Sequence, residues 1–274
     1  MEKTVYFCTG MPRSGSTLLM NILGQNPRFA VTATSGVWEM VRLVRGSWDK
    51  ASEMRAMPEV LSDAARVRVL RGMVQSFHAN VEQDIVFDKS RGWIITPELA
   101  EIVSDDRPLK FLVSVRPVLE VLSSCEKLYR KAHKRGASFP KDEAGGYQTV
   151  ANRVTTLLGN NELVGAPISG IRETLACGYR SNMYFVEFDR LTRSPNTVMS
   201  EIYEFLDEEP FPHDFENVAQ ITSENDRVYG WGDLHTIRPA VKPVEADWEH
   251  VLAKHIPPQQ IMALKAENEF WKGK

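Results

Sequence analysis

The stretch Thr4–Gln25 constrains the fold most, because a short apolar run leads through a glycine-bounded turn into a helical pattern. Thr4–Thr9 contains consecutive valine, tyrosine and phenylalanine residues, which predict a buried strand. From Ser16 to Gln25, leucine and isoleucine recur at helical spacing. Between the two elements, Gly10 and Gly15 allow successive backbone N–H groups to turn inward, next to the partial positive charge of a helix N-terminus. This order of elements predicts a phosphate-binding loop.

The loop departs from the nucleoside triphosphate motif G-x-x-x-x-G-K-[ST] at one decisive position. Gly10, Gly15 and Thr17 match the motif, but Ser16 stands where the lysine belongs, and the cation is at Arg13 instead. That lysine normally reaches the β- and γ-phosphates, so its absence argues against Mg²⁺-dependent triphosphate chemistry. We expect the loop to bind a smaller 5′ group, with a P-loop kinase-like phosphotransferase as the alternative function.

The loop sequence resembles a known family. Its residues follow the pattern of the 5′-phosphosulfate loop of sulfotransferases, which is Pro, Arg or Lys, Ser-Gly, Thr or Ser, then Thr. These enzymes take 3′-phosphoadenosine-5′-phosphosulfate (PAPS) as donor and release 3′-phosphoadenosine 5′-phosphate (PAP). The resemblance is to the tyrosylprotein and bacterial branch, and it implies that the donor is bound by Pro12, Arg13, Ser14, Gly15, Ser16 and Thr17.

Strands and helices alternate along the rest of the chain. Further strands are predicted at Phe29–Thr34, Asp84–Asp88, Leu109–Val115 and Met183–Glu187. The final stretch, Val251–Trp271, has the pattern of an amphipathic helix. The alternation predicts an α/β fold of the P-loop-containing nucleotide-binding type. We expect a doubly wound, mainly parallel sheet flanked by helices, with a helical cap, and a single sulfotransferase-like domain over residues 1–274.

A second pair of residues lies at the end of the central strand. Arg116 follows Leu109–Val115 directly, and Ser124 comes eight residues later. This spacing resembles the 3′-phosphate motif of sulfotransferases, and arginine suits the task because its planar fork pairs with two phosphate oxygens. Pro117 follows the arginine one position earlier than in the family, so either Ser123 or Ser124 is expected to face the phosphate.

The remaining residues that the resemblance assigns are Lys89, Arg238 and Phe188. Lys89 ends a strand and matches the family's Asn/Asp-Lys segment, in which the lysine stabilises the leaving oxygen; together with Arg13 it forms the predicted catalytic pair. Arg238-Pro239 resembles a basic residue and proline in tyrosylprotein sulfotransferases, within a loop over residues 229–239 that covers the donor. An aromatic residue near the position of Phe188 often lies beside the adenine, although a core phenylalanine is an equal alternative.

The resemblance implies a hydroxyl acceptor, either a small molecule or a peptide side chain. Activation of a hydroxyl needs a base within hydrogen-bond reach. Tyrosylprotein sulfotransferases have a glutamate after the second strand, whereas residues 33–36 here contain no acid. Glu39 is the best candidate, beside Trp38 at the expected mouth of the site, and His78 and His235 are the alternatives. Without a base, the chain would be a non-catalytic nucleotide-binding protein.

Composition narrows the class of protein. The net charge is −3, which argues against a general nucleic-acid partner. Three scattered cysteines suggest reduced thiols and a cytoplasmic setting. No signal peptide is recognisable, and no apolar run approaches the roughly 20 residues that cross a membrane. No His or carboxylate cluster has metal-ligand spacing, so we expect no metal.

Overall fold

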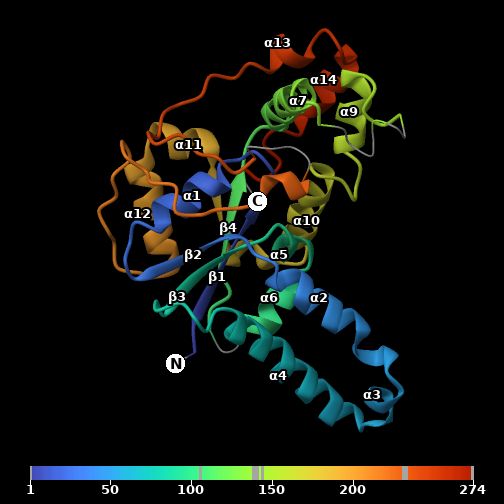
Figure 1. The fold of residues 1–274 in the computed structure, drawn as a ribbon, viewed down its shortest axis with the longest axis vertical. Coiled ribbons are helices and arrows are strands. Elements are labelled where there is room, and N and C mark those ends of the chain that lie inside the picture. Colours follow the sequence, from blue (N-terminus) through green and yellow to red (C-terminus); the bar gives the residue numbers. More distant parts are fainter. Residues whose placement is uncertain (1, 105–106, 138–141, 143–144, 230–233, 273–274) are drawn as a thin grey trace.

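The computed structural model describes residues 2–104, 107–137, 142, 145–229 and 234–272. Within these residues the core is a parallel five-stranded sheet in the order β2-β3-β1-β4-β5. The strands are β1 (Thr4–Gly10), β2 (Phe29–Thr34), β3 (Ile85–Lys89), β4 (Phe111–Val115) and β5 (Met183–Glu187). The predicted α/β class with a parallel sheet flanked by helices is confirmed (Figure 1).

The helices fill the connections between strands and the C-terminal region. They are α1 (Ser16–Leu23), α2 (Val37–Ser47), α3 (Ser52–Ala56), α4 (Glu59–Phe77), α5 (Gly92–Ile95), α6 (Pro97–Ser104), α7 (Val118–Lys134), α9 (Val150–Leu157), α10 (Gly165–Ala176), α11 (Phe188–Arg193), α12 (Pro195–Leu206), α13 (Trp248–Leu252) and α14 (Pro258–Ala266). None of the described helices is long and apolar enough to cross a membrane.

The prediction of one helix over Val251–Trp271 is wrong. The structure instead has α13 and α14, separated by the segment around Pro257-Pro258. A residue that precedes proline is disfavoured in the α conformation, and Pro257 itself is extended. The apolar periodicity continued through this break, but the two prolines stop the first helix and start the second.

The central strand β1 shows why both faces of the sheet are covered. Val5 and Phe7 face a core built with α4, α5, α6 and α7, whereas Tyr6 and Cys8 face a second core built with α1 and α12. Alternate residues of a strand point to opposite faces, so a continuous apolar run is buried on both sides only when helices pack on each face. Each fully buried apolar side chain contributes about 1.5–3 kcal/mol to folding.

The sheet order places a crevice at the carboxyl end of β1. The chain goes to one side of β1 for β2 and β3 and to the other side for β4 and β5. Parallel pairing sets Cys8 beside Lys89 on one side and Gly10 beside Ser114 on the other. Such a switch point is where open α/β sheets bind ligands. A Cβ on Gly10 would lie 2.1 Å from the Ser114 carbonyl oxygen, so the start of the loop requires glycine there.

Helices α2, α3 and α4 form an arm that extends away from the sheet (Figure 1). Within the arm, the indole Nε1 of Trp48 donates a hydrogen bond of 3.0 Å to Ser62 Oγ. At its base, Trp38 Nε1 donates to Thr96 Oγ1 at 2.9 Å. Both tryptophans therefore hold helices together.

Candidate active site

A cavity of about 550 Å³ opens at the carboxyl ends of the strands. Its walls come from the loop after β1, the ends of β2, β3 and β4, helix α7 and the C-terminal segment around residues 234–244. The predicted site residues that line it are Pro12, Arg13, Gly15, Ser16, Thr17, Lys89, Arg116, Ser124 and Arg238. Five separated stretches of sequence therefore meet in one concave site.

The loop after β1 is tightly curled. Arg13 has a φ of 58° and Gly15 a φ of 84°, which are left-handed conformations. Helix α1 begins directly after Gly15 and has no side-chain cap, so its first N–H groups are open to an anion. Ser14 is the predicted site residue that does not line the cavity. Its buried hydroxyl donates to the Met11 carbonyl and stabilises the loop from below.

Arg13 lies at the centre of the site. Its Nε donates a hydrogen bond of 3.1 Å to Ser124 Oγ, and its Nη1 donates to the Leu234 carbonyl. Burial lowers the pKa of its guanidinium from the ordinary value. The neighbouring Ser123 is turned away, and its hydroxyl donates to Asp247 Oδ1 at 2.6 Å. Of the two serines, Ser124 is thus the one that faces the cavity.

Arg116 connects the loop after β1 to α7 and to Phe188, the residue that follows β5. Its Nη1 donates to the Arg13 carbonyl at 3.3 Å, and its Nε donates to Glu120 Oε2 at 3.0 Å. The guanidinium lies 4.5 Å from the centroid of the Phe188 ring, a cation–π contact. A Cβ on Gly15 would meet this ring at 2.6 Å, so the loop, Phe188 and Arg116 pack as one unit.

The end of β3 carries a buried ion pair that the sequence did not predict. Lys89 Nζ lies 2.9 Å from Glu224 Oε1 and 3.5 Å from Thr17 Oγ1. Glu224 Oε1 also accepts the Thr34 backbone N–H at 2.8 Å. Burial lowers the pKa of Lys89, whereas Glu224 acts to raise it. Burial alone would raise the pKa of Glu224, but the Lys89 and Thr34 hydrogen bonds hold it below its usual value.

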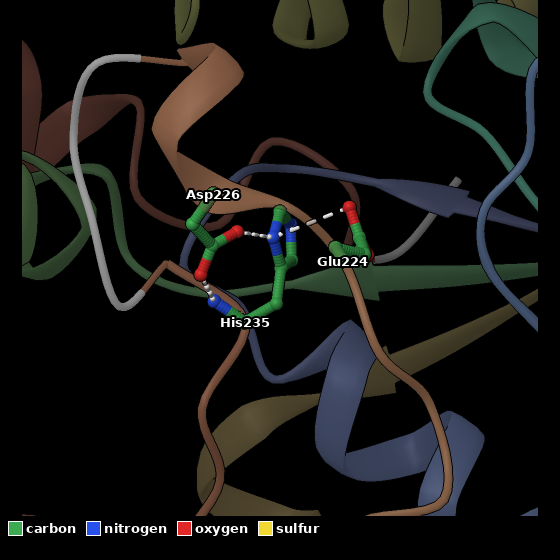
Figure 2. Close-up of side chains that lie close together, drawn as sticks. All are labelled: Glu224, Asp226 and His235. Atoms are coloured by element: carbon green, nitrogen blue, oxygen red, sulfur yellow. Dashed lines mark hydrogen bonds and ion pairs between the residues drawn. The ribbon is translucent and has the colours of Figure 1, made fainter.

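Beside this pair, His235 is held by two carboxylates (Figure 2). Its Nδ1 lies 2.6 Å from Asp226 Oδ1 and 3.3 Å from Glu224 Oε2, and its backbone N–H donates to Asp226 Oδ2 at 3.1 Å. The hydrogen bond to Asp226 Oδ1 favours the tautomer that carries the proton on Nδ1, which leaves Nε2 as the acceptor. His235 also lines the cavity.

The other two candidate bases lie elsewhere, which corrects the preference for Glu39. Glu39 is on the exposed side of α2, one turn from Arg42, with which it forms an ion pair. His78 is buried, with its Nε2 3.0 Å from Asp88 Oδ2. Neither residue lines the cavity, and the arm that carries them adds no described residue to it. The expected helical cap thus does not border this site.

Glu224 and Asp226 are the residues that sequence reasoning missed. They belong to a segment without apolar periodicity, and Glu224 is 135 positions from Lys89. Together with His235 they offer one possible ligand atom each, and these atoms lie within 4.8 Å of one another, a grouping that the spacing along the sequence did not reveal. In the structure, the Lys89 ammonium supplies the positive charge next to this group.

Residues 6–102, about a third of the chain, match the model of the sulfotransferase family. This part of the chain is similar to the sulfotransferase family. The matched segment contains the loop after β1 and Lys89, which are the residues that line the centre of the cavity. No curated protein matches the sequence.

Solved sulfotransferases share the fold. The sulfotransferase domain from the curacin biosynthetic pathway is 15% identical with a TM-score of 0.51, over 100% of this chain and 91% of that one. The sulfotransferase domain of the Synechococcus PCC 7002 olefin synthase is 15% identical with a TM-score of 0.51, over 93% and 97%. A sulfotransferase from Alicyclobacillus acidocaldarius is 14% identical with a TM-score of 0.50, over 98% and 93%. At these identities the likeness concerns the fold.

Proposed function

We propose that the protein transfers the sulfuryl group of PAPS to a hydroxyl acceptor and releases PAP. The observation that carries this proposal is the meeting, in one cavity, of the open N-terminus of α1, the Arg13 loop and a lysine. Lys89 Nζ lies 3.5 Å from Thr17 Oγ1, so the lysine stands directly against the first turn of α1. An anionic 5′ group at this helix end would be within reach of both cations.

The residues present suit the donor. The loop residues 12–17 and the N-terminus of α1 would hold its 5′ end. Arg116, Ser124 and Arg238 would hold its 3′-phosphate, and the Phe188 ring offers a flat surface for the adenine. Arg238 is exposed to the cavity and makes no hydrogen bond or ion pair with any described residue, so its charge remains for a ligand. A volume of about 550 Å³ lies within the usual range for small-molecule sites.

The arrangement supports sulfuryl transfer in line. The acceptor oxygen forms a bond to sulfur while the bond between sulfur and the 5′-phosphate oxygen breaks. His235 Nε2 accepts the hydroxyl proton, and the carboxylates of Asp226 and Glu224 stabilise the imidazolium that results. Lys89 and Arg13 stabilise the negative charge that develops on the leaving oxygen. In this mechanism side chains supply the positive charge, and no metal ion is required.

The cavity also supports a proposal about the extent of the domain. Its lining runs from Cys8 to Val244, so residues close to both ends of the chain contribute to one site. We therefore infer that residues 1–274 act as one unit. The acceptor is proposed to be a small molecule or a peptide side chain.

Nucleotide selectivity tests the donor. PAP should raise the melting temperature, because a ligand at a hundred times its Kd adds about 2.7 kcal/mol to stability. Adenosine 5′-phosphate, which lacks the 3′ group, and ATP should raise it far less. Equal shifts from PAP and adenosine 5′-phosphate would remove the 3′-phosphate assignment, and a larger shift from ATP would favour the kinase-like alternative.

Turnover of labelled PAPS tests the chemistry. Lys89→Ala should lower kcat and leave PAP affinity nearly intact, because its contact with the leaving oxygen strengthens in the transition state. Arg13→Ala should lower both, since Arg13 also shapes the loop. Lys50→Ala, an exposed lysine on the arm, is the control. Wild-type kcat in Lys89→Ala would refute the catalytic role of this lysine. PAP binding without any turnover would favour the non-catalytic alternative.

A further inference from the structure

The cations of the cavity differ in whether other residues of the protein hydrogen-bond or ion-pair with their side chains. Arg13 donates to Ser124 and to a backbone carbonyl, Lys89 is paired with Glu224, and Arg116 is paired with Glu120. Arg91, two residues after Lys89, lines the same cavity and is exposed to it. Its side chain makes no hydrogen bond or ion pair with any residue in the described parts of the chain.

The backbone that carries Arg91 is nonetheless firmly held. The Ser90 hydroxyl accepts the Gly92 N–H at 3.2 Å, and the Thr9 hydroxyl donates to the Arg91 carbonyl at 3.4 Å. A Cβ on Gly92 would lie 1.9 Å from the Trp38 ring, so the corner packs without spare room. A fixed backbone that presents an uncommitted guanidinium to a cavity is the arrangement expected of a binding residue.

Arg91 follows a different strand from Arg116 and Ser124, the proposed 3′-phosphate contacts. Arg116 and Ser124 follow β4, on one side of β1, whereas Arg91 follows β3, on the other side. Lys89, two residues before Arg91, lies against the first turn of α1. Burial lowers the pKa of the Arg91 guanidinium, while Cys125, Tyr229 and Glu224 act in the opposite direction. A charge in this setting is stabilised by an anion from a ligand.

The proposed function already assigns cations to both ends of the donor, and Glu224 offsets the charge of Lys89. We propose that Arg91 binds a carboxylate of the acceptor, so that the substrates are hydroxy acids, with the hydroxyl directed to His235. A carboxylate fits because a planar guanidinium can pair with both of its oxygens. This inference rests on the proposed function, and it specifies the acceptor class.

Paired acceptors test the proposal. Hydroxy acids such as 4-hydroxyphenylacetate and 3-hydroxybutyrate are compared with their amides, with labelled PAPS as donor. The wild-type protein should favour the acid in kcat/KM by about tenfold to a hundredfold, the range expected of charge-assisted hydrogen bonds. In Arg91→Gln this preference should fall to about one through a higher KM for the acid. Arg91→Lys should keep part of it, and Arg55→Gln, an exposed arginine on the arm, should keep all of it.

Titration calorimetry separates this proposal from the proposed function. PAP should bind wild-type and Arg91→Gln proteins with Kd values within about twofold, and the acids should bind the wild-type PAP complex but not that of Arg91→Gln. Three outcomes would overturn the inference and leave the donor site intact. The preference for the acid could survive in Arg91→Gln, the wild-type protein could show no such preference, or every acid could fail to bind the PAP complex. A large loss of PAP affinity in Arg91→Gln would assign the residue to the donor instead. Failure of PAP to bind wild type would refute the proposed function itself.

Discussion

Replacing Glu224 with leucine should isolate the Lys89 ammonium inside the protein. The two side chains are 6% and 7% exposed, and the ion pair is 2.9 Å long. The other contact of Lys89 Nζ is Thr17 Oγ1 at 3.5 Å, which cannot neutralise a charge. Removing one member of a buried pair typically costs about 3–5 kcal/mol, because the remaining charge is left without compensation. We expect Glu224→Leu to lose stability in this range at pH 7.

The cost should depend on pH in a defined direction. Burial already lowers the pKa of Lys89, and Glu224 is the group that opposes this effect most strongly. In Glu224→Leu the folded protein therefore binds the Lys89 proton more weakly than the unfolded chain does. The stability of the variant relative to wild type should then rise as the pH increases from 7 toward 10.5, the ordinary pKa of lysine. The rise should be about 1.4 kcal/mol for each pKa unit by which the folded variant lowers the pKa of Lys89.

Urea unfolding at pH 7, 8, 9 and 9.5 measures this dependence. With an m value of about 3 kcal/mol/M, the midpoint at pH 7 should fall by about 1 M or more. The double variant Lys89→Met/Glu224→Leu should regain most of the loss, since neither charge of the pair is then left without its partner. Glu39→Leu, which removes the exposed partner of Arg42, should leave the midpoint unchanged. The reasoning would be refuted by a cost below about 1 kcal/mol at pH 7, by a cost that does not change with pH, or by no recovery in the double variant.

Three further predictions follow from the site. Ser124→Ala should weaken PAP binding by about threefold to tenfold in calorimetry, which corresponds to the loss of one hydrogen bond. Ser123→Ala should leave PAP binding unchanged, because the Ser123 hydroxyl is hydrogen-bonded to Asp247 and Ser123 does not line the cavity. Equal losses of affinity in the two variants would contradict this assignment. Gly15→Ala should cost about 1–2 kcal/mol in thermal unfolding, because its φ is 84° and its Cβ would strike the Phe188 ring; an unchanged melting curve would count against it. On the alkaline side, the loss of kcat should begin at a pH below 10.5, the ordinary pKa of lysine, because burial lowers the pKa of Lys89. Lys89→Arg should move this loss to higher pH. A pH profile that does not move would exclude Lys89 as the titrating group.

Local sequence was sufficient for the parts of the protein that depend on neighbouring residues. The apolar run of β1, the spacing of Gly10 and Gly15 and the leucine pattern of α1 predicted the loop, because backbone turns and helix starts are decided within a few residues. Lys89 and Arg116 could be placed at one edge because each follows a predicted parallel strand, and parallel strands share their carboxyl edge.

Tertiary structure decided the rest. The rotation of α7 determined that Ser124, rather than Ser123, faces the cavity. The pairing of Glu224 with Lys89 joins residues 135 positions apart through a segment that has no periodic pattern, so only the folded path of the chain brings them together. The same path brings Asp226 against His235, which lines the cavity, while the arm carries Glu39 away from it. Periodicity specifies which face of an element is apolar, whereas contacts between distant loops depend on how all the elements pack.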